Sequence, residues 1–265
     1  MKKLIAYFRE LIRGRVYLQR FFLFLYKTSL VGMNFSGGAV VKNSGEANVV
    51  DYVSKKLPNG IALVIFDVGA HLGDYSNMLL EHLKNRKIQI HAFEPSNTTF
   101  QKLKINLAGK KVLLHNLGFS NEAKKMSLFY DYQTSVYASV YQRKLDHENR
   151  VMNISETIEL TTIDDFCRQH NVSHIHFLKM DIEGHEFFAL QGAKEMIKKN
   201  IDFIQFEFSA ANIDSRTYFK DFYYLLSENY NIYRVLRDGL CPLKNYNETQ
   251  EVFFTTNYLA ERKSK

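Results

Sequence analysis

The sequence contains few cysteines and lacks long hydrophobic runs. Of its 265 residues only Cys167 and Cys241 are cysteines, too far apart for a C-x-x-C metal site and too few for a disulfide framework. Their scarcity favours a reducing compartment, so we expect a cytoplasmic protein. No stretch approaches the roughly 20 apolar residues that a membrane-spanning helix needs. Repeats and low-complexity tracts are also lacking, and a hydrophobic content of 46% suits one large α/β domain with an appendage.

Positive charge is concentrated at one end of the chain. Residues 1–27 hold a surplus of six positive charges out of the formal net charge of +7, so the remainder is nearly neutral. This excludes a nucleic-acid-binding protein whose basic stripe crosses the folded domain. We expect residues 1–31 to form a basic amphipathic helical segment that packs on the folded domain or on a second subunit of a homo-oligomer, or that contacts a membrane surface through residues 1–27. The apolar face of its first turns is formed by Leu4, Ile5, Phe8, Leu11 and Ile12.

The rest of the chain divides into a short entry segment and one domain. Residues 32–60 contain a glycine-rich stretch, which we expect to act as a hinge or lid, followed by a helix. Residues 61–259 form the domain, and 260–265 a tail. Strands alternate with helices, which predicts a mostly parallel seven-stranded sheet with helices on both faces. The predicted strands are 61–67, 88–93, 112–116, 174–180, 202–208, 231–236 and 250–256, and the last two form an antiparallel edge hairpin. The predicted helices are 46–57, 74–85, 97–108, 163–170, 186–199 and 215–228.

The turn after the first strand, in VIFDVGAHLGDYSN, lacks the marks of a phosphate-binding loop. His71 stands where the G-x-G-x-x-G fingerprint needs its second glycine, and no Gly-Lys-Ser/Thr ending follows. An acid and two glycines suit a ligand that has a charged amino-acid end and no phosphate, such as S-adenosylmethionine. The candidate cofactor-binding residues of this turn are Asp67, Gly69, His71, Gly73 and Ser76.

Two further strand ends carry polar residues. Glu94 lies 21 residues after Gly73, close to the ~20-residue offset at which an acid reaches ribose hydroxyls in nucleotide-binding folds. Its alternative role is a carboxylate at a helix start, before Pro95. Asn116 ends the third strand, where its amide either meets the adenine edge or caps the turn. We therefore add Glu94, Pro95 and Asn116 to the candidate cofactor-binding residues.

The fourth strand end is the richest in ionisable groups. The stretch FLKMDIEGHEFF places Lys179, Asp181, Glu183, His185 and Glu186 around one glycine, and burying so many such groups without a function is costly. The alternative is that Glu183 and Glu186 stabilise a helix N-terminus and His185 is a surface group. Glu207 closes the fifth strand and is expected to face the same crevice.

These motifs together resemble the FkbM-type methyltransferases. The resemblance rests on FDVGAHLGDYS, HAFEPS, HNLGFS, TTIDDF and LKMDIEGHE, in that order, and covers Gly32 to Leu259. It implies a class I methyltransferase (Rossmann-like) fold, with S-adenosylmethionine over the first two strands and the acceptor over the fourth and fifth. It also implies O-methylation of a hydroxyl on a surface polysaccharide, a lipid-linked glycan or a small-molecule natural product.

This chemistry assigns roles to the acids. A hydroxyl needs a base within hydrogen-bond reach, and our hypothesis is that His185 or Asp181 takes the proton while Glu183 or Glu207 orients the base or the sugar. Asp181 is also counted among the cofactor-binding residues. A divalent metal on Asp181, Glu183 and Glu207 is an alternative that we do not favour, and we predict no metal site. Two further histidines, His174 and His176, lack a third ligand.

Three competing functions remain to be weighed against O-methylation. His71 disfavours a nicotinamide-dependent oxidoreductase, and KMDIEG stands where an adenine N-methyltransferase would carry Asn or Asp followed by Pro-Pro-aromatic. A catalytically inactive cofactor-binding or scaffold protein of the same fold stays open. The loop 131–150 is expected to cover the acceptor, with Tyr137 and Tyr141 stacking on a sugar or packing.

Overall fold

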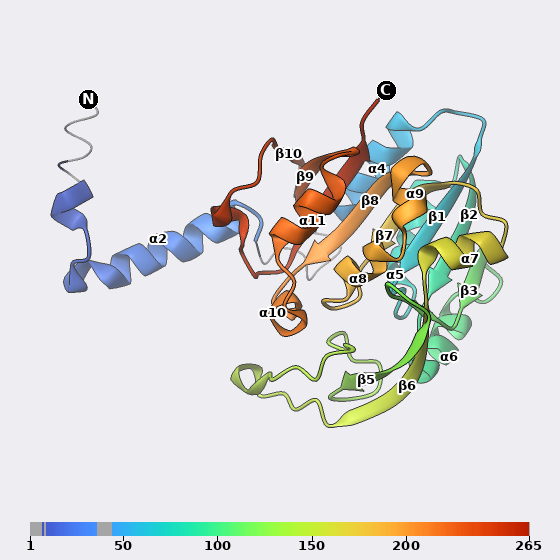
Figure 1. The fold of residues 1–265 in the computed structure, drawn as a ribbon, viewed down its shortest axis with the longest axis horizontal. Coiled ribbons are helices and arrows are strands. Elements are labelled where there is room, and N and C mark those ends of the chain that lie inside the picture. The colour runs from blue at the N-terminus through green and yellow to red at the C-terminus, as the bar shows by residue number, and fades with distance from the viewer. Residues whose placement is uncertain (1–6, 8, 36–43, 265) are drawn as a thin grey trace.

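A central sheet positions every functional element of the protein. The computed structural model describes residues 7, 9–35 and 44–264. Its eight-stranded sheet has the order β10 (Gly239–Leu243), β9 (Tyr230–Leu236), β11 (Thr256–Arg262), β8 (Ile201–Phe208), β7 (Ile175–Met180), β1 (Ala62–Val68), β2 (Lys87–Phe93) and β3 (Val112–His115) (Figure 1). The five strands from β8 to β3 are parallel, so their carboxyl ends meet at one edge. The strand order reverses between β1 and β7, which is where ligands bind in open sheets of this kind.

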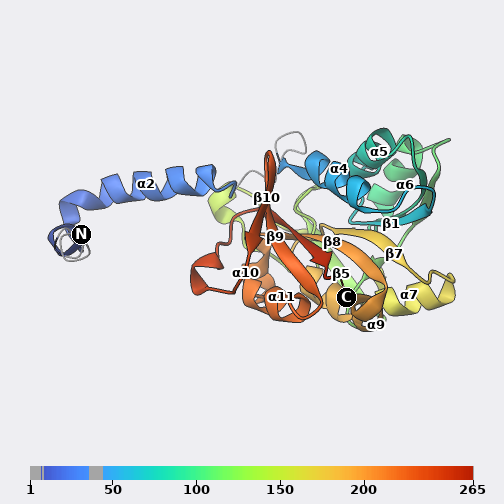
Figure 2. The ribbon, with the colours of Figure 1, turned by 90° about the horizontal axis from the view of Figure 1, so that it is seen from above.

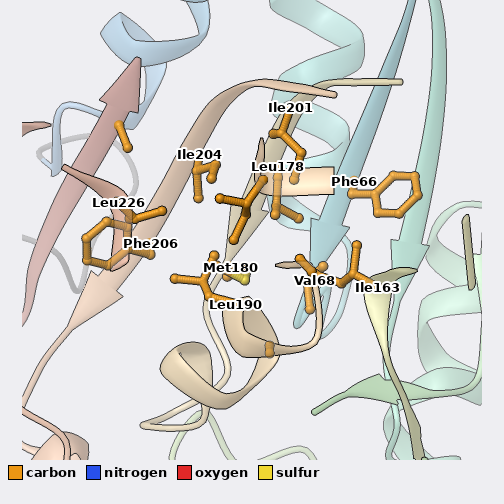
Figure 3. Close-up of a cluster of buried hydrophobic side chains, with 14 of the residues drawn as sticks. Phe66, Val68, Ile163, Leu178, Met180, Leu190, Ile201, Ile204, Phe206 and Leu226 are labelled. Carbon is orange, nitrogen blue, oxygen red and sulfur yellow. The ribbon is translucent and has the colours of Figure 1, made fainter. Parts of the chain in front are cut away.

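Helices cover both faces of the sheet (Figures 1 and 2). One face carries α4 (Glu46–Lys56), α5 (Asp74–His82) and α6 (Asn97–Asn106), and the other carries α7 (Ile163–Gln169), α8 (Glu186–Gln191), α9 (Lys194–Lys199) and α11 (Phe219–Leu226). Strand β1 is apolar on both sides because it is covered twice: Leu63 and Ile65 pack with α4 and α5, whereas Phe66 and Val68 belong to the cluster under α7 and α8 (Figure 3).

A smaller three-stranded sheet interrupts the alternation. It has the order β4 (Gly118–Phe119), β6 (Ile154–Thr161), β5 (Lys124–Tyr130), and residues 131–153, with the short helix η2 (Asp146–Glu148), connect β5 to β6. Its apolar side gathers Leu128, Tyr130, Ile158 and Leu160. Two short elements complete the domain, α10 (Ala211–Ser215) and η3 (Glu248–Gln250).

The N-terminal segment projects away from the domain as η1 (Val16–Leu18) and α2 (Gln19–Gly32) (Figures 1 and 2). Packing of this segment along the folded domain, one of the expected arrangements, is therefore not what the structure shows for α2. Residues 1–6 and 8 of the predicted amphipathic helix, and residues 36–43 of the glycine-rich stretch, lie outside the described residues. Within the described part of the chain, no helix is both long enough and apolar enough to cross a bilayer.

Of the last two predicted strands, 231–236 is confirmed as β9, whereas the last strand and its pairing were predicted wrongly. The sheet has eight strands rather than seven, and the edge hairpin pairs β9 with β10, which lies in the stretch with Pro242 that was expected to be a loop between the last two strands. Proline is tolerated there because an edge strand does not need every backbone N–H. The last strand runs over Thr256–Arg262 instead of 250–256, and it lies between β8 and β9, antiparallel to both. The predicted helix 186–199 is divided into α8 and α9.

Candidate active site

A cavity of about 420 Å³ lies at the carboxyl ends of β1, β2, β7 and β8, and the β5–β6 connection helps to line it with residues 135–138, Val140 and Arg143. The structure brings eight of the twelve predicted site residues to its wall. They are Gly69, His71, Glu94, Pro95, Asp181, Glu183, His185 and Glu207. The other four, Asp67, Gly73, Ser76 and Asn116, do not line the cavity.

The turn between β1 and α5 approaches the turn after β7 very closely. Gly69 has φ +81°, and a Cβ on it would overlap the backbone carbonyl of Asp181, so only glycine fits. His71 also adopts the left-handed conformation, with φ 49°. Its Nε2 lies 3.0 Å from the carbonyl oxygen of Thr134 in the β5–β6 connection. The turn after β1 therefore contacts both the turn after β7 and the β5–β6 connection.

A buried lysine links the two turns below the cavity. Lys179 pairs with Asp67 in the register of β7 and β1, and its Nζ lies 3.7 Å from Asp67 Oδ1 and 3.5 Å from Asp181 Oδ2. Ser76 Oγ donates to the other oxygen of Asp67 at 2.7 Å. Burial raises the pKa of Asp67 and by itself would lower that of Lys179, but the carboxylates of Asp181 and Asp67 raise the pKa of Lys179 above its usual value. Lys179 therefore remains charged inside the protein.

A series of contacts between buried polar side chains extends from this lysine to α4. The Lys179 ammonium lies 4.8 Å from the ring centroid of Tyr75, whose hydroxyl donates to Gln205 Oε1 at 3.0 Å. The Gln205 amide in turn donates to Glu46 Oε1 at 3.0 Å and to Asn257 Oδ1 at 3.1 Å. The sequence reading did not identify these residues, because four separate elements supply them. Glu46 reaches the cavity wall, so these contacts fix the start of α4 against the site.

Glu94 supports two turns at once while it lines the cavity. Its carboxylate accepts the backbone N–H of His71 at 3.0 Å and that of Ser96 at 2.9 Å. Burial raises its pKa to about 7. Asn116 takes the turn-capping role of its two alternatives, since its amide donates to the carbonyls of Glu94 at 2.9 Å and Pro95 at 3.1 Å.

Three carboxylates face one another on the opposite side of the cavity. Each of Asp181, Glu183 and Glu207 offers an oxygen within 4.8 Å of the oxygens of the other two. Burial, together with the charge of Asp181, raises the pKa of Glu183 and of Glu207. Glu183 has φ 51°, a conformation that costs free energy in a non-glycine residue and recurs at functional sites. We refer to these three residues as the carboxylate trio.

Arg143, from the β5–β6 connection, is a site residue that the sequence reading missed. Its buried guanidinium donates to Glu183 Oε2 at 2.7 Å and to Asp214 Oδ2 at 3.2 Å. Ser139 of the same segment donates to the Glu183 carbonyl at 2.8 Å. The prediction that the loop 131–150 covers the site is consistent with these contacts, which hold it over the carboxylate trio.

His185 does not offer a free nitrogen to a substrate. Its Nδ1 lies 2.9 Å from the Tyr141 hydroxyl and its Nε2 lies 3.0 Å from Ser120 Oγ. Burial lowers its pKa to about 4. The hypothesis that His185 is the base therefore needs correction, since both ring nitrogens are engaged and the ring is a weak base. Glu186 accepts the N–H groups of Ile182 and Gly184 and so takes the helix-start role.

His174 and His176 have a third possible metal ligand beside them, but the geometry disfavours a metal. His174 Nε2 lies 2.8 Å from Asp202 Oδ2, close to His176. Nδ1 of His176 accepts the backbone N–H of Val64 at 2.9 Å, which leaves its proton on Nε2. A metal ligand needs the reverse arrangement, with the second nitrogen donating.

The strand order and the acidic cavity at its reversal point define a class I methyltransferase fold. Residues 67–234, more than half of the chain, match the family model described as the methyltransferase FkbM domain, and the chain belongs to this family.

Similar proteins include the hexuronic acid methyltransferase AglP of Haloferax volcanii, with 28% identity over 167 residues. The match covers 62% of this chain, and the chain spans 62% of the length of AglP. A solved structure of methyltransferase FkbM from Methylobacillus flagellatus is 19% identical, with a TM-score of 0.45, over 78% of this chain and 45% of that one. A TehB-like methyltransferase from Corynebacterium glutamicum is 12% identical, with a TM-score of 0.40, over 93% and 96% of the two chains.

The buried ion pair predicts a large loss of stability on removal of its cation. Lys179→Met leaves the Asp67 carboxylate buried with Ser76 as its neutral partner, so we expect the free energy of unfolding to fall by about 3–5 kcal/mol in denaturant titrations. Adding Asp67→Asn to this variant removes the uncompensated charge and should restore part of the loss. A single variant within about 1 kcal/mol of the wild type would contradict the structural role of the pair.

Proposed function

We propose that this protein transfers the methyl group of S-adenosylmethionine to a sugar hydroxyl, in a surface polysaccharide or a lipid-linked glycan. The observation that carries the proposal is the division of one cavity between Glu94 on one side and the carboxylate trio on the other. AglP supports a sugar acceptor, because its name describes a methyltransferase that acts on a hexuronic acid.

The residues present fit S-adenosylmethionine. Glu94 is a buried acceptor that faces the cavity from the strand next to β1, and it suits ribose hydroxyls. The left-handed turn at Gly69 and His71 exposes backbone to the same space, and Phe119, Leu128 and Leu160 provide an apolar wall for a flat ring. When bound, the cofactor supplies an electrophilic methyl group on a positively charged sulfur, a charge that the acidic wall stabilises.

The carboxylate trio is the base that the reaction needs. An acceptor hydroxyl placed beside it can release its proton to a carboxylate. Within the trio we assign proton removal to Asp181, since its side chain is 39% exposed against 21% for that of Glu183. Glu183, held by Arg143, then orients the acceptor. Closure by the β5–β6 connection limits the access of water.

Charge in the cavity also selects the acceptor. Three carboxylates within 4.8 Å of one another disfavour an anionic acceptor group. A neutral hydroxyl of the sugar therefore fits better as the methylated group than a carboxylate of the sugar does. A divalent cation on the trio remains the less favoured arrangement, because Lys179 and Arg143 already bring positive charge beside Asp181 and Glu183.

Incubation with labelled S-adenosylmethionine and extracted cell-envelope glycans tests the proposed function. We expect label in sugars as an alkali-stable methyl ether, and we expect a strong chelator to leave the rate unchanged. Label recovered as an alkali-labile ester would assign the acceptor to a carboxylate, and a chelator-sensitive rate would assign a metal to the trio. Absence of label despite cofactor binding would favour the scaffold alternative or a small-molecule natural product as the acceptor.

Substitutions at the two candidate bases distinguish their roles. Asp181→Asn keeps the shape but removes the proton acceptor, and it should lower kcat by at least ~100-fold in the labelling assay. His185→Gln should reduce kcat less, because it disturbs only the support that Tyr141 and Ser120 receive. Donor affinity, measured by calorimetry, should change by less than about tenfold in either variant. The reverse order of kcat losses would return the role of base to His185.

A further inference from the structure

The N-terminal helix presents apolar side chains that the domain does not cover. Helix α2, all of whose residues the structure describes, has Leu30 as its single buried residue. Phe21 is 54% exposed, Phe24 is 64% exposed, and Tyr17 of η1 is 77% exposed. In Figures 1 and 2 the C-terminal end of the helix lies next to the domain, and the rest of the helix projects away from it. Large exposed apolar surfaces of this kind mark interaction sites in soluble proteins.

The same segment carries charge of almost one sign. Arg9, Arg13, Arg15, Arg20 and Lys27 are all exposed. Glu10 is the sole acidic residue among the first 45 of the sequence, and it pairs with Arg13 at 3.1 Å. A partner of this segment must therefore accept both aromatic side chains and a net positive charge.

The two features are only partly separated around α2, because Leu23 and Phe24 lie three or four residues from Arg20 and Lys27 and share their side of the helix. Arg20 and Lys27 are seven residues apart and share one face of the helix. Phe21, Phe22 and Leu25 lie on the opposite side, and the rings of Phe21 and Phe22 are in edge contact with centroids 5.6 Å apart. A helix that lies in the interface of a bilayer has this arrangement, with aromatic side chains among the acyl chains and basic side chains at the headgroups.

Charge decides between a lipid surface and a second copy of the chain. Each segment carries a net positive charge, so the association of two such segments is opposed by the repulsion of like charges. An anionic lipid surface instead attracts every one of them. We propose that residues 9–31 dock the protein on an anionic lipid surface.

The base of the helix is fixed to the domain, so docking would also orient the cavity. Leu30 and Phe35 are buried, Asn34 donates to the carbonyl of Val235 at 3.1 Å, and the Arg234 guanidinium lies 4.7 Å from the Phe35 ring centroid. Glu46, at the start of the next described helix, lines the cavity. A protein docked in this way would hold its cavity close to acceptors that are themselves attached to lipid. The docking itself does not depend on the proposed chemistry.

Co-sedimentation of the full chain with vesicles tests this inference. We expect the bound fraction to rise at least ~10-fold from phosphatidylcholine vesicles to vesicles that also contain phosphatidylglycerol, and to fall as salt is added. The double variants Arg20→Glu with Lys27→Glu, and Phe21→Ser with Phe24→Ser, should each lose at least ~10-fold of this binding. Matched controls on the domain, Lys111→Glu with Lys199→Glu and Ile105→Ser with Tyr224→Ser, should bind as the wild type does.

Three outcomes would overturn the inference. They are absence of vesicle binding, equal binding to neutral and anionic vesicles, and equal losses of vesicle binding in the α2 variants and in the control variants. A dimer in light scattering that Phe21→Ser with Phe24→Ser dissociates, without vesicle binding, would assign the helix to a subunit interface. Circular dichroism shows whether each variant is folded. Vesicle binding needs no methyl transfer. A protein that fails to bind vesicles could therefore still have the proposed function, and a protein without methyltransferase activity could still bind vesicles.

Discussion

The site depends on one buried cation, Lys179, held between Asp67 and Asp181. These residues end β1 and its neighbour β7, where the order of the parallel strands reverses. The lysine neutralises carboxylates that would otherwise repel one another in a medium of low dielectric constant. It thereby allows the turn at Gly69 to meet the Asp181 carbonyl, and the floor of the cavity forms from two strands joined by an ion pair.

On this floor the cavity has two chemically different halves. Glu94 and the turn after β1 form the half proposed for the cofactor, whereas Asp181, Glu183 and Glu207 form the half proposed for the acceptor. The β5–β6 connection spans both, through the contact of Thr134 with His71 and that of Arg143 with Glu183. A change in either half can therefore reach the other through this segment, as well as through Lys179.

Much of this could be predicted from the sequence where local rules decide. The parallel strands and their helices follow from short apolar runs and helical spacing, and eight site residues gather because the carboxyl ends of parallel strands share one edge. Local rules do not reveal which distant residues meet. Arg143 stands in a segment without periodicity, 40 residues before Glu183, and the bonds of His185 to Tyr141 and Ser120 connect separate elements. Strand β10, which contains Pro242, was not predicted, because an edge strand obeys weaker sequence rules than a central one.

The central claim is that the cavity binds S-adenosylmethionine through Glu94, and calorimetric titration tests it most directly. The account predicts one molecule bound per chain, with affinity lowered at least ~10-fold by Glu94→Gln and unchanged by the control Glu122→Gln on the surface. No binding of S-adenosylmethionine or S-adenosylhomocysteine, together with saturable binding of a nicotinamide dinucleotide, would contradict it.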